Sequence, residues 1–171
     1  FVGGNAVVKL IADGHDVRLL VRRPLRVATT LGAIGVDLEA LDIVEGDMTD
    51  PVAVGRAAKG MDATIHAAAV VAALDRKEAA LALDANVNGT RNVVDAALDA
   101  GCDPVVHFSS IAAVFRPDVP LITSDLPPVI DAASPYTRAK ALAEELARDR
   151  QSQGAPVTIV YPGGVMGPPV G

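Results

Sequence analysis

A tyrosine and a lysine four residues apart, Tyr136 and Lys140, are the side chains whose types and spacing most directly suggest acid–base chemistry. Residues four apart lie on one face of a helix, so the phenol and the ammonium would be neighbours. A neighbouring cation stabilises a phenolate, which makes Tyr136 a candidate general acid and base. The alternative is an exposed tyrosine beside a solvated lysine.

Two serines, Ser109 and Ser110, follow an apolar run over residues 105–108 that is typical of a buried strand. In a parallel sheet, ligands bind at the carboxyl ends of the strands. A hydroxyl at that place could bind a substrate oxygen while Tyr136 exchanges a proton with that oxygen. A serine after a strand can equally form a turn or cap a helix, and this alternative stays open.

Short apolar segments alternate with helical segments along the chain. Strands are expected over residues 16–22, 41–45, 63–66, 105–108 and 157–160. Helices are expected around residues 7–11, where Val7, Leu10 and Ile11 share a face, and over residues 26–31, 51–59, 77–100 and 136–151. This alternation predicts βαβ units and therefore an α/β fold with a parallel sheet.

The composition narrows the classes of function. Of the 171 residues, 50% are hydrophobic and 3% are aromatic, which predicts one domain with an aliphatic core. The net charge of −6 argues against nucleic-acid and anionic-membrane binding. The single cysteine, Cys102, excludes an intrachain disulfide, and His66 and His107 are expected to be packed rather than metal-binding. No apolar run reaches the roughly 18–20 residues of a membrane span, so a cytoplasmic protein is expected.

Six short motifs occur in order: FVGG at residues 1–4, GDMTD at 46–50, IHAAA at 65–69, NVNGT at 86–90, the set of Ser110, Tyr136 and Lys140, and YPGGVMGP at 161–168. With these motifs the sequence resembles the extended short-chain dehydrogenase/reductase group, also called the NAD-dependent epimerase/dehydratase family. The pair Val21-Arg22 resembles the dihydroflavonol-reductase-like and 3β-hydroxysteroid-dehydrogenase-like branches. Tyr161 stands where the family usually has an arginine.

The resemblance implies a Rossmann-type fold, a doubly wound parallel sheet with helices on both faces. It also implies that residues 1–171 form one NAD(P)-binding domain, incomplete at both ends, without the first strand and without the C-terminal substrate region. That strand would lie between the strands expected near residues 16 and 63, so its absence would leave two strand edges unpaired. We therefore expect this chain by itself to be inactive and poorly stable.

The catalytic set that the resemblance implies is Ser110, Tyr136 and Lys140. Ser110 would hold the substrate oxygen, Tyr136 would pass the proton, and Lys140 would also contact the nicotinamide ribose. Ser110 is assigned by analogy with members that carry Ser-Ser-Ile, because Ile111 occupies the position that usually carries the hydroxyl. Asn86 would either support the proton relay or brace its helix.

The resemblance also implies cofactor-binding residues at the start of the chain and after the strands. These are Gly3, Asp47, Met48, Ala68, Ala69, Lys140, Pro162, Gly163 and Val165. Two further residues, Arg22 and Arg23, stand where NAD-preferring sites carry an acid. A guanidinium suits a 2′-phosphate, so NADP(H) is expected in preference to NAD(H). The alternative is that both arginines are only surface side chains.

The function that the resemblance implies is hydride transfer between a nicotinamide cofactor and a secondary alcohol or ketone of a small-molecule substrate. Two alternatives stay open: a nucleotide-sugar epimerase or dehydratase, and a non-catalytic dinucleotide-binding regulatory module. Arg22 weighs against the first alternative, and the intact catalytic set weighs against the second. A homodimer through the helix that carries Tyr136 is a family expectation, whereas a nucleic-acid partner is not.

Overall fold

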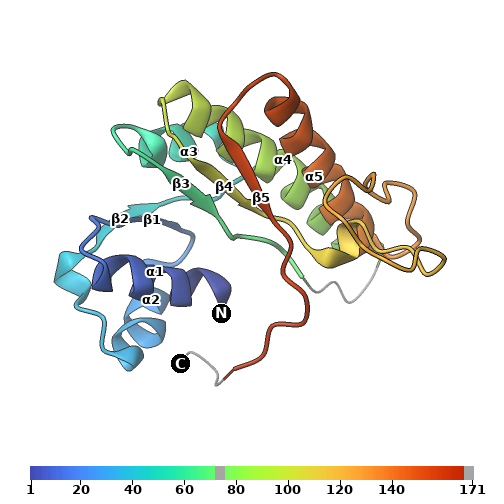
Figure 1. Ribbon diagram of the computed structural model, residues 1–171. Coiled ribbons are helices and arrows are strands. Elements are labelled where there is room, and N and C mark those ends of the chain that lie inside the picture. The colour runs from blue at the N-terminus through green and yellow to red at the C-terminus, as the bar shows by residue number, and fades with distance from the viewer. Residues whose placement is uncertain (72–75, 168–171) are drawn as a thin grey trace.

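The strands are short and parallel, and they form two sheets (Figure 1). The computed structural model describes residues 1–71 and 76–167. In the first sheet β1 (Arg18–Val21) pairs with β2 (Asp42–Glu45). In the second, β4 (Val105–Phe108) lies between β3 (Thr64–His66) and β5 (Val157–Val160). Within the described residues no strand joins β1 to β3, which is the position that the resemblance assigned to the first strand.

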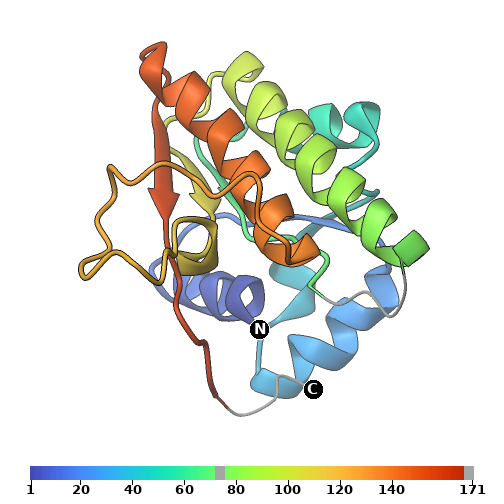
Figure 2. The same cartoon turned by 90° about the vertical axis from the view of Figure 1, so that its right-hand side faces the viewer.

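Helices cover both faces of these strands. On one face lie α3 (Pro51–Ala58), α4 (Arg76–Asp99) and α5 (Pro135–Ser152). On the other face lie α1 (Val2–Ala12) and α2 (Pro24–Thr30), below the strands in the view of Figure 1. The perpendicular view in Figure 2 shows the same two layers, with α4 and α5 side by side. The structure is therefore an α/β fold with a parallel arrangement of strands and helices on both sides, as the sequence predicted.

Local sequence explains where the helices α3 and α5 begin. Asp50 precedes α3, and its Oδ1 accepts the N–H groups of Val52 at 2.9 Å and Ala53 at 3.3 Å. Ser134 precedes α5 and accepts the N–H of Thr137 at 3.4 Å. Each capping residue is followed by a proline, whose fixed φ suits the first helical position. Because α5 begins at Pro135, Tyr136 lies in its first turn.

Two glycines end helices in the left-handed conformation that only glycine adopts without strain. Gly14 follows α1 with φ 85°, and Gly101 follows α4 with φ 82°. These turns send the chain back toward β1 and β4, so the helices pack against the strands that follow them.

Besides a small cluster of Ala113, Val129 and Ala141, the core of the described residues consists of two largely aliphatic clusters. One cluster, between the second sheet and the helices α4 and α5, consists of Val94, Ala97, Cys102, Val105, Ala147 and Val157. The other lies between the first sheet and the helices α1 and α2, around Val7, Val27 and Leu31. Small side chains such as Ala97 and Ala147 let α4 and α5 approach each other closely.

The structure also differs from the sequence predictions in local detail. The helix expected over residues 26–31 begins earlier, since α2 starts at Pro24, whose fixed φ suits the first helical position. Three short 3-10 helices were not predicted, at Gly32–Ile34, Leu38–Ala40 and Ile111–Ala113. A three-residue helix has too few residues to show a hydrophobic period, so sequence patterns do not reveal it.

Candidate active site

The segments that follow β4 and β5 run side by side beyond the ends of the strands. The N–H of Ser109 donates to the carbonyl of Val160 at 2.9 Å, and the N–H of Ile111 donates to the carbonyl of Pro162 at 3.0 Å. Ser110 lies between these two bonds and is half-buried. The structure therefore brings two predicted site residues, Ser110 and Pro162, to the same edge of the sheet.

The hydroxyl of Ser110 also caps a helix, the alternative that the sequence left open. Its Oγ accepts the N–H of Ala112 at 3.2 Å at the start of the 3-10 helix Ile111–Ala113. This contact uses an oxygen lone pair and leaves the O–H proton free to donate to another group. Capping and binding of a substrate oxygen are therefore compatible at Ser110.

Lys140 reaches the same edge from α5. It is 6% exposed, and its Nζ donates to the carbonyl of Phe108 at 2.7 Å, two residues before Ser110. Burial, opposed by the negative charge of Glu144, lowers the pKa of Lys140 from 10.5 to about 8. Tyr136 lies one turn earlier in α5 and is half-buried. The meeting of the Ser110 and Tyr136 hydroxyls stays a prediction.

Two histidines lie next to Lys140 and are packed, as the sequence predicted. The rings of His66 and His107 stack with centroids 5.5 Å apart and planes inclined by 29°. His66 Nε2 lies 3.0 Å from the hydroxyl of Thr90, whereas neither ring nitrogen of His107 has a hydrogen-bond partner among the described residues. Burial lowers the pKa of His66 to about 4 and that of His107 to about 3. Both rings are therefore neutral near pH 7 and add no positive charge beside Lys140.

Asn86 clamps the backbone that follows β3. Its amide oxygen accepts the N–H of Val70 at 2.7 Å, and its amide nitrogen donates to the carbonyl of Val70 at 2.9 Å. Asn86 is buried, so this pair of bonds favours the bracing role over the proton relay. The braced segment carries Ala68, which is exposed, and Ala69, which is half-buried. Their small side chains leave room for a ligand near the backbone.

The carboxyl ends of β1 and β2 bring Arg22 and Asp47 together. Arg22 Nε lies 3.7 Å from Asp47 Oδ2, and Asp47 Oδ1 accepts both the N–H and the hydroxyl of Thr49 at 2.9 Å. Met48 packs against α4: a Cβ added to Gly89 would lie 2.6 Å from Met48 Cγ. Asp47 and Met48, which the resemblance assigns to the cofactor, thus follow β2, and the Asp47 carboxylate already accepts two hydrogen bonds from Thr49.

A pocket of about 330 Å³ opens beside Arg22 and Arg23. Val21, Val27 and Thr30 line it together with a third arginine, Arg26, which the sequence analysis did not single out. Arg26 lies three residues after Arg23, which stands at the start of α2, so helical spacing was the signal that could have found it. Three of the six residues that line the pocket are thus arginines, the residue type that binds anions most readily.

Gly3 lies in α1, close to the segment that follows β3. A Cβ at Gly3 would lie 3.8 Å from the Cβ of Ala67, an ordinary van der Waals distance, and the cofactor role of Gly3 stays a prediction. A tighter contact is at Gly167, where a Cβ would lie 2.3 Å from the ring of Phe1. The start of α1 therefore contacts the loop that follows β5.

The loop after β5 is open. A Cβ at Gly163 would meet no atom within 4 Å, and Val165 is 50% exposed. Pro168, the last residue of the motif in this loop, lies outside the described residues. Pro162, Gly163 and Val165 thus line an accessible edge beside Ser110.

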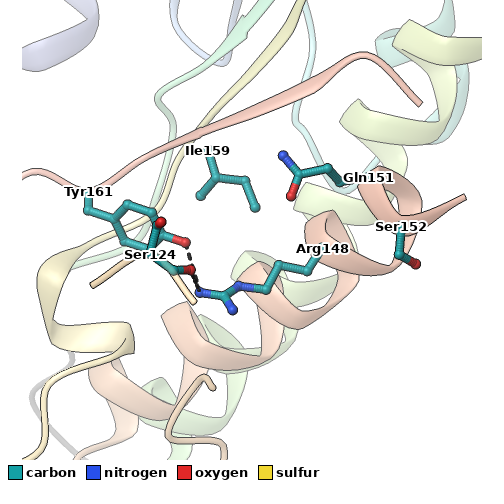
Figure 3. Close-up of a pocket in the computed structure, with 6 residues that line it drawn as sticks. All are labelled: Ser124, Arg148, Gln151, Ser152, Ile159 and Tyr161. Carbon is teal, nitrogen blue, oxygen red and sulfur yellow. Dashed lines mark hydrogen bonds between the residues drawn. The ribbon is translucent and has the colours of Figure 1, made fainter. Parts of the chain in front are cut away.

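A buried polar network lies behind Ser110, and the sequence did not reveal that it joins Ser109 and Tyr161 to Glu144. Ser109 donates from Oγ to Glu144 Oε2 at 2.6 Å, and Tyr161 donates from its hydroxyl to Glu144 Oε1 at 2.9 Å. Arg148 forms an ion pair with the same carboxylate and also donates to the hydroxyl of Tyr161 and the carbonyl of Ser124, both at 2.9 Å. Figure 3 shows Arg148 pointing toward Tyr161 and Ser124 at a pocket of about 340 Å³. The four-residue spacing of Lys140, Glu144 and Arg148 was the signal for this network.

Residues 1–71 and 76–167 contain neither a helix that could cross a membrane nor a metal-binding cluster. None of their helices combines the length and apolarity needed to cross a membrane. No group of three or more histidine, cysteine, aspartate or glutamate side chains in these ranges could hold a metal ion.

A parallel α/β fold with small residues, arginines and a buried lysine at the carboxyl ends of its strands is typical of dinucleotide-binding proteins. A match to the NAD dependent epimerase/dehydratase family spans residues 1–170, and the chain belongs to this family. The resemblance stated from the six motifs is thereby confirmed.

Curated relatives of the chain carry several different enzyme names. Sterol demethylase protein B of Methylococcus capsulatus is 33% identical over 168 residues, covering 98% of this chain and 49% of that protein. A protein of Synechocystis sp. named for dihydroflavonol 4-reductase is 32% identical, covering 98% and 47%. The 3-beta-hydroxysteroid dehydrogenase of Mycolicibacterium neoaurum is 29% identical, covering 98% and 45%. The chain thus spans about half the length of these curated relatives.

Solved structures agree on the fold. A short-chain dehydrogenase/reductase superfamily protein from Agrobacterium tumefaciens with bound NAD superposes with a TM-score of 0.75 at 30% identity, over 94% of this chain and 45% of that one. DesIV, a dTDP-glucose 4,6-dehydratase from Streptomyces venezuelae with NAD and TYD bound, gives 0.74 at 29% identity, over 93% and 51%. The fold is the Rossmann-type α/β fold that the sequence predicted.

Proposed function

We propose that the protein is an NAD(P)-dependent oxidoreductase that transfers a hydride between a nicotinamide cofactor and a secondary alcohol or ketone. The observation that supports this most directly is the position of Lys140. Its ammonium binds the carbonyl of Phe108 at the carboxyl end of β4, two residues before Ser110 and one helical turn after Tyr136. A buried cation at this point stabilises a phenolate, which is what a tyrosine acid and base requires.

The proposed mechanism assigns one task to each side chain. When bound, the nicotinamide supplies the hydride to the carbonyl carbon or accepts it from the alcohol. During ketone reduction Ser110 donates a hydrogen bond to the carbonyl oxygen, and Tyr136 gives its phenolic proton to that oxygen. Lys140 stabilises the phenolate that remains. During alcohol oxidation Tyr136 accepts the hydroxyl proton instead.

The residues after the strands fit a dinucleotide. Ala68 and Gly163 leave their surroundings open, and Asp47 lies at the end of β2 where the adenine would bind. We assign Met48, Ala69, Pro162 and Val165 to the same cofactor, together with Gly3 at the start of α1. Apart from Gly3, these residues follow the carboxyl ends of strands, where ligands bind to parallel sheets.

NADP(H) is the cofactor that the arginine pocket favours. Arg23 and Arg26 line it together with Arg22, whose guanidinium lies near Asp47. A 2′-phosphate would find bidentate donors there. The test is a titration of the natural full-length protein with NADPH and NADH, repeated with Arg23→Ala and Arg26→Ala. Tighter NADPH binding that falls in both variants is expected, whereas tighter NADH binding in the wild type would contradict the preference.

Tyr136→Phe tests the catalytic assignment. The variant lacks the transferable proton, so turnover of a carbonyl substrate should fall by about 100-fold or more. Binding of the cofactor, measured by fluorescence titration, should stay close to that of the wild type because Tyr136 has no assigned part in cofactor binding. A variant that keeps most of its turnover would show that Tyr136 is not the proton donor.

A nucleotide-sugar epimerase or dehydratase is the second candidate, favoured by the similarity to a dTDP-glucose 4,6-dehydratase. Such enzymes restore their cofactor within each turnover, so a substrate panel separates the two candidates. Net formation or loss of reduced cofactor supports the oxidoreductase, whereas conversion of a nucleotide sugar without net change in the cofactor supports the alternative.

Three further proposals concern the domain organisation, the cellular compartment and the oligomeric state of the protein. Residues 1–171 form one NAD(P)-binding domain, the protein acts in the cytoplasm, and two copies dimerise through α5. Sedimentation of the natural full-length protein tests the last of these, since a monomer would contradict it.

A further inference from the structure

Glu144 is the buried charged residue around which the carboxyl ends of β4 and β5 and the helix α5 are tied together. It is fully buried at 0% exposed and lies one turn after Lys140 in α5. Its two oxygens accept from different segments, Oε2 from Ser109 after β4 and Oε1 from Tyr161 after β5. A single carboxylate therefore joins three segments that carry proposed site residues.

The carboxylate is stabilised as a charged group by its partners. Arg148, one turn later in α5, reaches Glu144 Oε1 with Nε at 2.8 Å and with Nη2 at 2.7 Å. The cation that balances the Glu144 carboxylate is thus Arg148, from the same helix. At position 161, where the family usually has an arginine, the tyrosine contributes a hydroxyl donor instead. Burial and the hydrogen bond to Glu144 raise the pKa of Tyr161, so its hydroxyl stays protonated and donates. A buried carboxylate with this set of donors has a defined position.

We propose that Glu144 is a positioning residue for the reaction, which holds the Ser109–Ser110 segment and the Tyr161–Pro162 segment against the helix that carries Tyr136 and Lys140. The proposal rests on the proposed function, in which Ser110, Tyr136 and Lys140 are the reacting groups. Ser109 is fixed to Glu144 by its side chain and to Val160 by its backbone, so Ser110 begins from an anchored neighbour. Displacement of about 1 Å in such a set lowers rates by about 100-fold.

Glu144 also acts on Lys140 through its charge. The titratable groups with an electrostatic effect on or from Lys140 are Glu144 on α5, His66 on β3 and His107 on β4, and the neutral phenol of Tyr136 lies one turn before Lys140 on α5. The two histidines are neutral, so Glu144 is the one of these groups that favours the ammonium over the neutral amine. Removal of its charge would lower the pKa of Lys140 further, and the high-pH limb of the turnover profile would move to lower pH.

Two substitutions of Glu144 distinguish its positioning role from the effect of its charge on Lys140. Glu144→Gln keeps the length of the side chain and removes the charge, whereas Glu144→Asp keeps the charge and shortens the reach to Ser109. In the natural full-length protein we expect both variants to lower kcat by about tenfold or more with little change in KM, because misplaced catalytic groups affect the chemical step. The high-pH limb should move to lower pH only in Glu144→Gln.

Glu145→Gln is the matched control, since Glu145 is the next residue in α5 and is exposed. It should leave kcat, KM and the pH profile unchanged. A folded Glu144→Gln variant with wild-type kcat and a wild-type high-pH limb would overturn the proposal. If that variant does not fold, Ser109→Ala decides in its place: it removes one hydroxyl bonded to Glu144, and unchanged kcat would overturn the proposal.

Tyr136→Phe, measured in the same series, separates this proposal from the proposed function. If Tyr136→Phe keeps its turnover, the assignment of the reacting groups fails, whatever the Glu144 variants do. If Tyr136→Phe loses turnover and folded Glu144→Gln does not, the reaction stands and the positioning role of Glu144 fails.

Discussion

Replacement of the buried Lys140 by methionine is expected to abolish activity and to stabilise the fold near neutral pH. Burial, opposed by Glu144, lowers the pKa of Lys140 from 10.5 to about 8. That difference corresponds to about 3 kcal/mol against the ammonium in the folded protein. Methionine has a similar length without the charge, but it leaves the carbonyl of Phe108 without its 2.7 Å hydrogen bond, a loss of about 1–3 kcal/mol. The net expectation is a gain of about 1 kcal/mol near pH 7.

The stability difference between Lys140→Met and the wild type depends on pH. The unfolded chain keeps the lysine proton up to pH 10.5, whereas the folded protein loses it at about 8. Between these values the unfolded state binds more protons, so the free energy of unfolding of the wild type rises with pH. The advantage of the variant is therefore largest below pH 8 and shrinks, then reverses, toward pH 10.5.

Urea unfolding followed by circular dichroism at several pH values measures this difference. Lys59→Met is the matched control, because Lys59 is exposed and its replacement should leave both the stability and its pH dependence unchanged. A Lys140→Met variant whose stability difference from the wild type stays constant from neutral to alkaline pH would refute the reasoning. The ammonium would then not be disfavoured by burial.

Two further predictions concern stability. Gly46→Ala should destabilise the protein by about 1–3 kcal/mol, because its Cβ would lie 2.5 Å from the Cβ of Ala53. Gly55→Ala, whose Cβ would meet no atom within 4 Å, should not lower the melting temperature, and equal melting temperatures of the Gly46→Ala and Gly55→Ala variants would contradict the prediction. Because burial lowers the pKa of His66 to about 4 and of His107 to about 3, only the unfolded chain binds these protons near the ordinary value of 6.5. The contribution of the two neutral histidines to stability should be complete above pH 6.5 and fall toward pH 4, and a flat urea-unfolding profile across that range would exclude this effect.

The secondary structure followed closely from local sequence. The runs at residues 105–108 and 157–160 are apolar and β-branched, as strands covered by helices require, and they form β4 and β5 with the predicted bounds. Tyr136 and Lys140 share a helix because Ser134 and Pro135 define its start. Such features depend on neighbours a few residues away, so patterns of four or five residues are enough to predict them.

What the sequence could not predict depends on residues far apart in the chain. Ser109 and Glu144 are 35 residues apart and meet because β4 lies beside β5 and α5 covers both. The amide of Asn86 meets Val70 in the same way, which favours bracing over the relay.

The sequence by itself therefore determined the family, the order of strands and helices, and the residue types available for acid–base chemistry. Only the tertiary structure decided which of these groups are buried. Burial gives Lys140 its lowered pKa and makes an ion pair between Glu144 and Arg148 necessary, because a charge removed from water needs a partner. Composition and spacing do not contain that information, since solvent exclusion is a property of the packed chain.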